Sequence, residues 1–292
     1  MDSSRKSYGS QSMIAPLRRV LVKKPGEDFA GADPVIWHYK SRPNLEKARR
    51  EHDELVAVLQ EAGIEIIYHG DVPGGLADAI YVYDPAVVTD EGAVILRMGK
   101  DLRRGEEQAM AQRLEALGVP VRHTLHGQAR AEGGDLLWID QHTLAVGLGF
   151  RTNGEGLRQL IQALAGLGIT IRPVELPYHL GPETCLHLMS LISIVDVDLA
   201  VVYQPLLSIT FWQYLRERGF RLIPVPEEEF VTMGTNVLAL APGRCLMLEG
   251  NPVTQKRLEE AGCQVLTCRG EEIYLKARGG PTCLTRPILR EY

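Results

Sequence analysis

The chain has 292 residues, 45% of them hydrophobic, which is enough to bury a large core in one domain or two. Its formal net charge is −5 and no basic stripe is visible, so nucleic acid is not an expected partner. No apolar run approaches the roughly 20 residues that span a bilayer, and five cysteines without a regular framework are typical of a reducing compartment, so we expect a cytoplasmic protein with no membrane partner.

In chain order, the predicted elements repeat a unit of two strands, a helix and a third strand that a glycine introduces. A looser first copy has a strand at residues 20–22, a helix at 44–62 and a strand at 63–67. The second copy lies at 86–88, 93–96, 102–117 and 118–121, and the third at 136–139, 143–146, 155–167 and 168–171. The fourth lies at 192–195, 199–202, 210–218 and 219–223, and the fifth at 236–240, 244–248, 252–261 and 262–266.

This repeat predicts one domain. Each predicted helix ends at a glycine, the residue that most easily takes the left-handed conformation of a helix cap. Each unit is too small to bury its own apolar face, so five units should share one centre. No stretch rich in Gly, Pro or Ser divides the chain. We therefore predict a single α/β domain over residues 1–292, with pseudo-fivefold ββαβ repeats closed into a ring by the last strand.

Three residues far apart in the sequence point to chemistry. Cys283 lies in a Gly/Pro turn after the last predicted helix, a poor place for a core residue, although a packed thiol is the alternative. Glu132 begins a Glu-Gly-Gly-Asp motif that is commonly a turn, and His187 has the apolar neighbours of a core histidine. Together, a thiol, an imidazole and a carboxylate are the parts of an activated-cysteine site.

Four further charged residues lie in notable contexts. Asp78 and Asp84 flank the apolar residues 79–82, where acids at strand ends are usually solvated. Arg104 lies in an Arg-Arg-Gly-Glu motif and Arg151 in a Gly-Leu-Gly-Phe-Arg-Thr-Asn motif. Surface arginines near helix starts are the alternative for both, although a helix N-terminus disfavours a cation.

We expect neither a metal nor a nucleotide cofactor. His123 and His126 are three residues apart with no Cys or carboxylate motif beside them, so we interpret them as loop residues. No glycine-rich phosphate motif follows a predicted strand.

Taken together, these motifs resemble those of the guanidino-group-modifying enzymes of the pentein fold, which are the dimethylarginine dimethylaminohydrolases, the arginine deiminases and the amidinotransferases. The resemblance spans nearly the whole chain and rests on six ordered motifs, at residues 78–88, 103–106, 132–135, 147–153, 186–188 and 282–283. It implies a five-bladed αβ propeller, in agreement with the five predicted units. It also implies a small-molecule guanidino substrate and no cofactor, and it is compatible with a homodimer, which no residue pattern decides.

The resemblance implies a catalytic role for three residues. Cys283 would attack the guanidinium carbon as a thiolate and form an S-alkylthiouronium. His187 would protonate the departing amine and then activate water for the release of the ureido product. Glu132 would orient His187 and stabilise its charged form.

The resemblance also implies how substrate is held. Asp78 and Asp84 would grip the planar guanidinium through paired hydrogen bonds and preserve its positive charge. Arg151 and Arg104 would hold the α-carboxylate, which an arginine fork matches. Asp135 is expected to be structural and to cap its turn.

Two positions depart from the family patterns. Met189 stands two residues after His187, where arginine deiminases carry an acid that grips the guanidinium. Tyr83 precedes Asp84, where relatives often have an acid or another polar residue, and this leaves the methylation state of the substrate open. We predict a hydrolase that converts N-methylated arginine to citrulline and dimethylamine. An arginine deiminase, an amidinotransferase and a binding protein that has lost catalysis are the alternatives.

Overall fold

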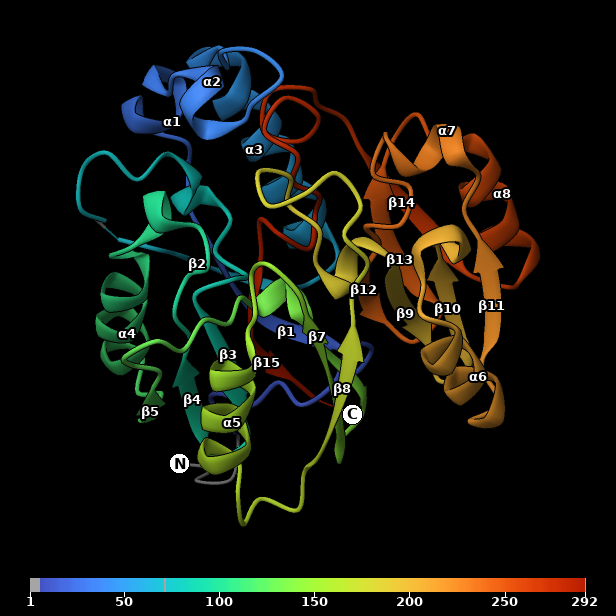
Figure 1. Cartoon of the computed structure of the whole chain (residues 1–292). Coiled ribbons are helices and arrows are strands. Elements are labelled where there is room, and N and C mark those ends of the chain that lie inside the picture. The colour runs from blue at the N-terminus through green and yellow to red at the C-terminus, as the bar shows by residue number, and fades with distance from the viewer. Residues whose placement is uncertain (1–5, 71, 292) are drawn as a thin grey trace, which may run out of the picture.

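The computed structural model describes residues 6–70 and 72–291, and its strands form five sheets of three strands each. Figure 1 shows the sheets gathered around the middle of the molecule, with helices such as α4, α6 and α8 at its outer edge. In every sheet the central strand pairs antiparallel with one neighbour and parallel with the other. The parallel pair needs a long connection, and a helix supplies it in each unit.

The elements follow the predicted repeat. The first sheet contains β15 (Arg286–Arg290), β1 (Leu17–Val22) and β2 (Glu65–Tyr68), with α3 (Leu45–Glu61) before β2. The second contains β3 (Ala86–Thr89), β4 (Gly92–Ile95) and β5 (Val121–Thr124) with α4 (Glu106–Ala116), and the third β6 (Leu136–Asp140), β7 (Thr143–Leu148) and β8 (Thr170–Glu175) with α5 (Gly154–Ala163). The fourth contains β9 (Ile192–Asp196), β10 (Leu199–Val202) and β11 (Arg221–Pro224) with α6 (Ile209–Glu217), and the fifth β12 (Leu238–Ala241), β13 (Arg244–Leu248) and β14 (Gln264–Cys268) with α8 (Pro252–Glu260).

Short helices occupy the connections. They are α1 (Glu27–Gly31), α2 (Pro34–Trp37) and α7 (Glu227–Phe230), and the 3-10 turns η1 (Ala77–Ile80), η2 (Asp101–Arg103), η3 (Gly133–Asp135), η4 (Leu188–Ser190) and η5 (Gln204–Leu206). η1 contains Asp78, η2 precedes Arg104, and η3 and η4 follow Glu132 and His187, all of which the sequence predicts to be functional. The connections therefore carry the candidate site, and the sheets carry the core.

Burial within each sheet explains why the repeat is stable. Every residue of β4 and of β10 is buried, whereas β5 and β11 alternate or are partly exposed. The buried strands are rich in Val, Ile, Leu and Ala, as expected for strands covered on both faces. The α/β fold class and the five ββαβ units are confirmed. The extent of the single domain stays a prediction, and residues 1–5, 71 and 292 of it lie outside the described residues.

The second unit differs from its prediction at the start of its helix. The expected helix over residues 102–117 is divided into η2 and α4, because Gly105 adopts a φ of 109° that an α-helix cannot include. This break sets the directions of the two arginines that precede it.

The last segment of the chain completes the first sheet. β15 pairs antiparallel with β1, with Leu21 opposite Arg286, so the last strand of the chain joins the first sheet. This pairing places Cys283 beside the second unit, where the backbone N–H of Tyr83 donates to its carbonyl oxygen at 3.2 Å.

The segment that leads to Cys283 is tied to α3. The carboxylate of Glu51 accepts hydrogen bonds from the backbone N–H groups of Glu271, Glu272 and Ile273 at 2.8 to 3.1 Å. One acidic side chain on α3 thus replaces the secondary-structure partners that this loop lacks.

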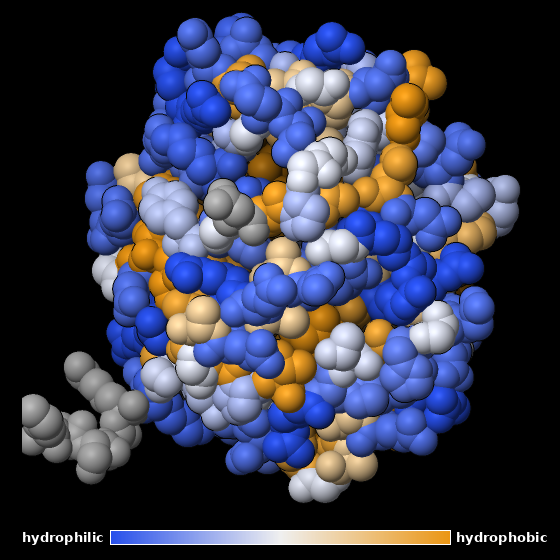
Figure 2. Space-filling model, turned by 90° about the vertical axis from the view of Figure 1, so that its left-hand side faces the viewer, coloured by the Kyte–Doolittle hydropathy of each residue, from blue (hydrophilic) through white to orange (hydrophobic). Residues whose placement is uncertain are grey.

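The surface in Figure 2 is mainly hydrophilic, with hydrophobic residues set among the polar ones. None of the helices in the described ranges has both the length and the apolar character needed to cross a membrane.

We predict that Glu51→Ala lowers the free energy of unfolding by about 2 kcal/mol, because three backbone donors lose a charged acceptor. Urea denaturation measures this loss. Glu54→Ala is the matched control, because Glu54 is an exposed acid on the same helix. Equal stability of the two variants would contradict the role of Glu51.

Candidate active site

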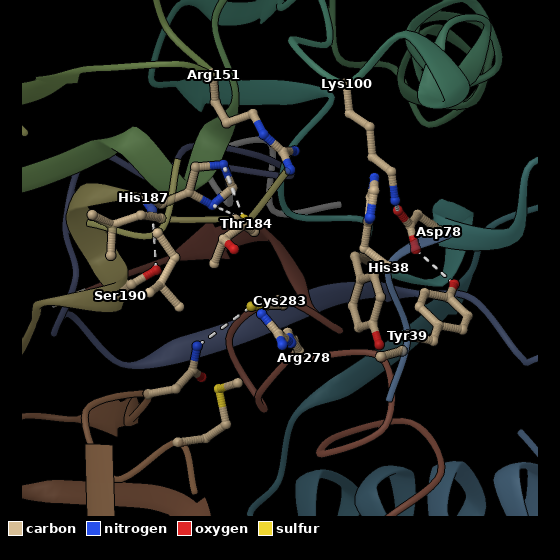
Figure 3. Close-up of a pocket in the computed structure, with 18 of the residues that line it drawn as sticks. His38, Tyr39, Asp78, Lys100, Arg151, Thr184, His187, Ser190, Arg278 and Cys283 are labelled. Carbon is tan, nitrogen blue, oxygen red and sulfur yellow. Dashed lines mark hydrogen bonds and ion pairs between the residues drawn. The ribbon is translucent and has the colours of Figure 1, made fainter. Parts of the chain in front are cut away.

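A cavity of about 300 Å³ is lined by segments that range along the chain from Trp37 to Cys283. Five residues predicted for the site line it, namely Asp78, Asp84, Arg151, His187 and Cys283. In Figure 3, His187 and Arg151 lie on one side of the pocket, and Asp78 with Lys100 lies on the other. The fold therefore brings these residues, from distant parts of the sequence, to one pocket.

His187 and Glu132 form a buried pair. His187 Nε2 lies 2.7 Å from Glu132 Oε2, and Arg151 Nη1 donates to the same oxygen at 3.2 Å. The backbone N–H groups of Gly99 and Lys100 donate to Oε1 at 2.8 and 3.1 Å. Burial opposes the charge of Glu132, but Arg151 and His187 outweigh it and hold its pKa well below the ordinary 4.5. Glu132 is therefore a carboxylate that fixes one ring nitrogen of His187.

The charge of His187 is set by its surroundings. Burial acts to lower the pKa of His187, but Cys185, Asp84 and Asp135 together raise it well above the ordinary 6.5. These surroundings therefore favour the protonated imidazole. With Nε2 held by Glu132, the proton on Nδ1 is the one available for transfer.

Packing around His187 explains the Gly-Gly-Asp sequence after Glu132. A Cβ on Gly134 would lie 2.3 Å from His187 Nδ1, so only glycine allows the ring its position. Asp135 is fully buried, and its Oδ1 accepts from the backbone N–H of Leu188 at 2.9 Å. The motif therefore positions His187 from two sides, and Asp135 has contacts that suit a structural role.

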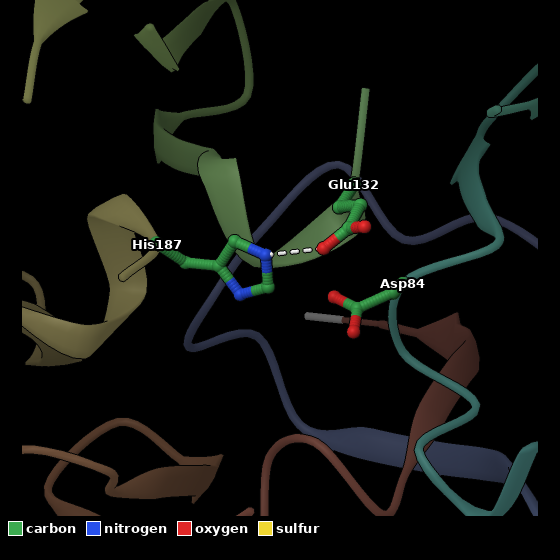
Figure 4. Close-up of side chains that lie close together, drawn as sticks. All are labelled: Asp84, Glu132 and His187. Carbon is green, nitrogen blue, oxygen red and sulfur yellow. Dashed lines mark hydrogen bonds and ion pairs between the residues drawn. The ribbon is translucent and has the colours of Figure 1, made fainter. Parts of the chain in front are cut away.

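Asp84 faces the same histidine. Its Oδ2 accepts from Arg103 Nη1 at 2.6 Å, and its Oδ1 accepts from the backbone N–H of Gly134 at 2.9 Å. Figure 4 shows Asp84, Glu132 and His187 converging. A ring nitrogen of His187 and one carboxylate oxygen from each acid all lie within 4.8 Å of one another. A cationic group in the pocket would thus meet a fixed carboxylate beside a proton donor.

The same three side chains offer ligand atoms of the kinds that bind metals. Both carboxylates, however, already accept hydrogen bonds from guanidinium groups, Arg103 on Asp84 and Arg151 on Glu132. A divalent cation among them would be repelled by two nearby positive charges. This donor set therefore fits a metal poorly.

Asp78 is fully engaged by the protein. Tyr39 Oη donates to its Oδ1 at 2.6 Å and Lys100 Nζ donates to its Oδ2 at 2.6 Å. Lys100 is held in turn by the Trp37 carbonyl oxygen at 3.0 Å and lies over the Trp37 ring. For Asp78 to grip a guanidinium, Lys100 would have to give up this ion pair, so its predicted role stays a prediction.

The predicted arginines have different placements. Arg151 lines the pocket with its guanidinium on Glu132. Arg104 does not line the pocket among the residues that the structure describes, and its nearest ion pair is with the exposed Asp101 at 3.6 Å. Its neighbour Arg103 is buried and points into the site, because η2 ends before Gly105 and turns consecutive side chains apart. The sequence thus identified the motif but not the arginine that faces the pocket.

The sulfur of Cys283 accepts a hydrogen bond from a side-chain amide. The side chain is half-buried and lines the pocket, and Asn236 Nδ2 donates to its Sγ at 3.4 Å. Burial, with the Asp84 carboxylate nearby, raises the pKa of the Cys283 thiol to about 11, although His187 acts in the opposite direction. The thiol is therefore protonated at neutral pH.

A second cysteine, to which the sequence analysis assigned no role, lies in the pocket. Cys185 lines the pocket, and its Sγ lies 3.6 Å from His187 Nδ1. Its place two residues before His187 is the available signal, since alternate residues of an extended segment share a side.

A family model described as "N,N dimethylarginine dimethylhydrolase, eukaryotic" matches residues 36–290. The chain belongs to this family. The predicted relationship to the pentein enzymes, and an amidine-hydrolysing activity at the level of the family, are thereby confirmed.

Two relatives match over most of their length. The chain is 30% identical to the uncharacterized protein YkgA of Bacillus subtilis, over 98% of this chain and 94% of the relative. It is 29% identical to an N(G),N(G)-dimethylarginine dimethylaminohydrolase of Streptomyces coelicolor, over 92% of this chain and 96% of the relative.

Solved structures show the same fold. The dimethylarginine dimethylaminohydrolase of Pseudomonas aeruginosa complexed with citrulline has a TM-score of 0.77 at 23% identity, covering 93% of this chain and 99% of that one. The N-terminal domain of ArgZ, an arginine dihydrolase from cyanobacteria, has a TM-score of 0.81 at 20% identity, covering 94% and 98%. The predicted pentein fold is confirmed.

The Glu132–His187 pair predicts a pH-dependent stability. The pKa of Glu132 is lower in the folded than in the unfolded protein, so its charge stabilises the fold above pH 4.5. The pKa of His187 is higher in the folded than in the unfolded protein, so its charge stabilises the fold most below pH 6.5. We expect Glu132→Gln to cost about 3 kcal/mol of unfolding free energy between these values, because buried donors lose their charged partner. The difference from wild type should shrink as the pH falls below 4.5 and as it rises above 6.5.

Urea denaturation at pH 3.5, 5.5 and 9 measures this dependence. Glu260→Gln, which removes an exposed carboxylate paired with Lys256, is the control and should change little at any pH. A Glu132→Gln deficit that is the same at all three values would show that the pair is not charged as described.

Proposed function

We propose that the protein hydrolyses a guanidino C–N bond of an arginine derivative through a covalent intermediate on Cys283, and that N-methylated arginine is its substrate. The observation that carries the proposal is the convergence of four groups on one pocket. A protonated His187 held by Glu132, the carboxylate of Asp84 and the thiol of Cys283 are the parts that this reaction needs.

Substrate binding would begin the reaction by changing the charge around the sulfur. A guanidinium next to Asp84 would place a positive charge near Cys283, and a nearby cation favours the thiolate. Burial and Asp84 hold this thiol protonated, so the proton would leave to water when a cation binds. The site would then activate its nucleophile in the presence of the correct charge.

The chemical steps follow from the positions of the side chains. The thiolate adds to the guanidinium carbon and a C–S bond forms. His187 gives its proton to the departing amine as the C–N bond breaks, which leaves an S-alkylthiouronium and a neutral imidazole. The imidazole then takes a proton from water, which attacks the same carbon. The C–S bond breaks as the hydroxyl group on that carbon gives up its proton, which returns the sulfur to a thiol and leaves the ureido product.

The choice of N-methylated arginine rests on the family and on Met189, which stands two residues after His187 where arginine deiminases carry an acid. The family model and the Streptomyces coelicolor relative carry that activity in their names. Met189 is buried, and it is not among the described residues that line the pocket. Tyr83 is likewise buried, with its hydroxyl 3.8 Å from Met13 Sδ. Neither departure adds a carboxylate, so Asp84 is the acid we assign to the reacting nitrogens.

The test is a substrate panel of arginine, monomethylarginine, dimethylarginine, agmatine and guanidinoacetate, assayed for ureido product and free amine. We expect dimethylarginine to give citrulline and dimethylamine. Cys283→Ser should lower turnover by more than about 1000-fold while the fold is kept. Cys268→Ser is the matched control, because Cys268 is buried in the core of the first and fifth units.

Three outcomes decide among the alternatives. Ammonia from arginine as the preferred reaction would identify a deiminase. Turnover only with an added amine acceptor would identify a transferase. No product from any compound in the panel would remove the enzyme assignment for this pocket.

A further inference from the structure

We propose that Asn236 is a catalytic residue whose side-chain amide donates a hydrogen bond to Cys283 Sγ and stabilises the thiolate. The inference rests on the proposed role of Cys283 as the nucleophile. It assigns a function to a residue for which the sequence pattern gave no signal.

The orientation of the amide is fixed by its other contact. Asn236 Oδ1 accepts from the backbone N–H of Thr282 at 3.1 Å. Because an N–H can donate only to the oxygen, the NH₂ group must be the end that faces Cys283 Sγ at 3.4 Å. The amide therefore clamps two consecutive residues and presents a donor to the sulfur.

The turn before Cys283 is built around this amide. A Cβ on Gly280 would lie 2.2 Å from Asn236 Cγ, so a side chain there would displace the amide. The backbone of Asn236 is itself held, since its N–H donates to the Met233 carbonyl oxygen at 2.9 Å. The amide is thus close-packed on one side and faces the pocket on the other.

The segment is also tied to the histidine side of the site. Thr235 Oγ1 donates to the Ser190 carbonyl oxygen at 2.7 Å, and Ser193 Oγ donates to the Thr235 carbonyl oxygen at 2.7 Å. Ser190 ends η4, the turn that follows His187. The amide is therefore fixed relative to the proton donor as well as to the sulfur.

The sulfur needs such a donor. Burial and Asp84 both oppose the negative charge on Cys283. A thiolate accepts hydrogen bonds more strongly than a thiol does, so an N–H already aimed at the sulfur favours the charged form. Because the amide is neutral, it gives this stabilisation without repelling a guanidinium in the pocket. A lysine in its place would repel that substrate.

The experiment measures the alkylation rate of Cys283 by iodoacetamide from pH 6 to 11, resolved by peptide mass spectrometry. Asn236→Asp keeps the shape and replaces the donor with an acceptor, and Asn236→Ala removes it. We expect the apparent pKa of Cys283 to rise by about one unit in Asn236→Ala and by more in Asn236→Asp. At pH 8 this is a roughly tenfold slower alkylation in Asn236→Ala.

Two controls separate the amide from general packing. Cys185 lies in the same pocket and should keep its alkylation profile in each variant. Asn251→Ala removes another buried amide, one bonded to the Thr232 and Leu248 carbonyl oxygens, and should lower stability without moving the Cys283 profile. If Asn236→Ala does not fold, Asn236→Asp decides on the same measurement.

A Cys283 profile in both Asn236 variants equal to that of wild type would overturn the inference. The assay uses no substrate, so it is independent of the proposed reaction. A shifted profile in a protein that turns over no guanidino compound would retain the amide's effect and reject the proposed function. Turnover of a guanidino compound by the wild type, with the same Cys283 alkylation profile in the Asn236 variants as in the wild type, would retain the proposed function and reject the role of the amide.

Discussion

The buried carboxylate of Glu132 is the interaction on which the site depends. It accepts from the His187 ring, from Arg151 and from the backbone of Gly99 and Lys100, which come from different units of the repeat. A charge with no access to water is tolerable only when its lone pairs are all used. The contacts that compensate the burial of Glu132 also orient His187. The same hydrogen bonds therefore stabilise the fold and set the geometry of the site.

Acidic and basic side chains are paired across the pocket that Cys283 lines. Arg103 and Lys100 pair with Asp84 and Asp78, and burial keeps the Cys283 thiol protonated. A bound cation would change that balance, and the Asn236 amide would then add a donor already in place. We therefore propose that the Cys283 thiolate forms only when substrate is bound. The protein without substrate would then present no thiolate to oxidants or alkylating agents.

Much of this was predictable because it depends on local pattern. Alternating apolar runs, helices and terminal glycines gave the five units, and motif order gave Cys283, His187 and Glu132. The direction of Arg103 was not predictable, because it follows from the left-handed backbone of Gly105. The contacts of Lys100 and Asn236 were not predictable either, since each joins units whose relative positions only the complete fold determines.

The central claim is that sulfur forms a bond to the guanidinium carbon. The most direct measurement is rapid acid quenching of wild-type protein during turnover of dimethylarginine, followed by mass analysis of the peptide that contains Cys283. We expect a transient adduct on that peptide with the mass of the substrate less dimethylamine. Continued turnover with an unmodified Cys283 peptide at every quench time would contradict it.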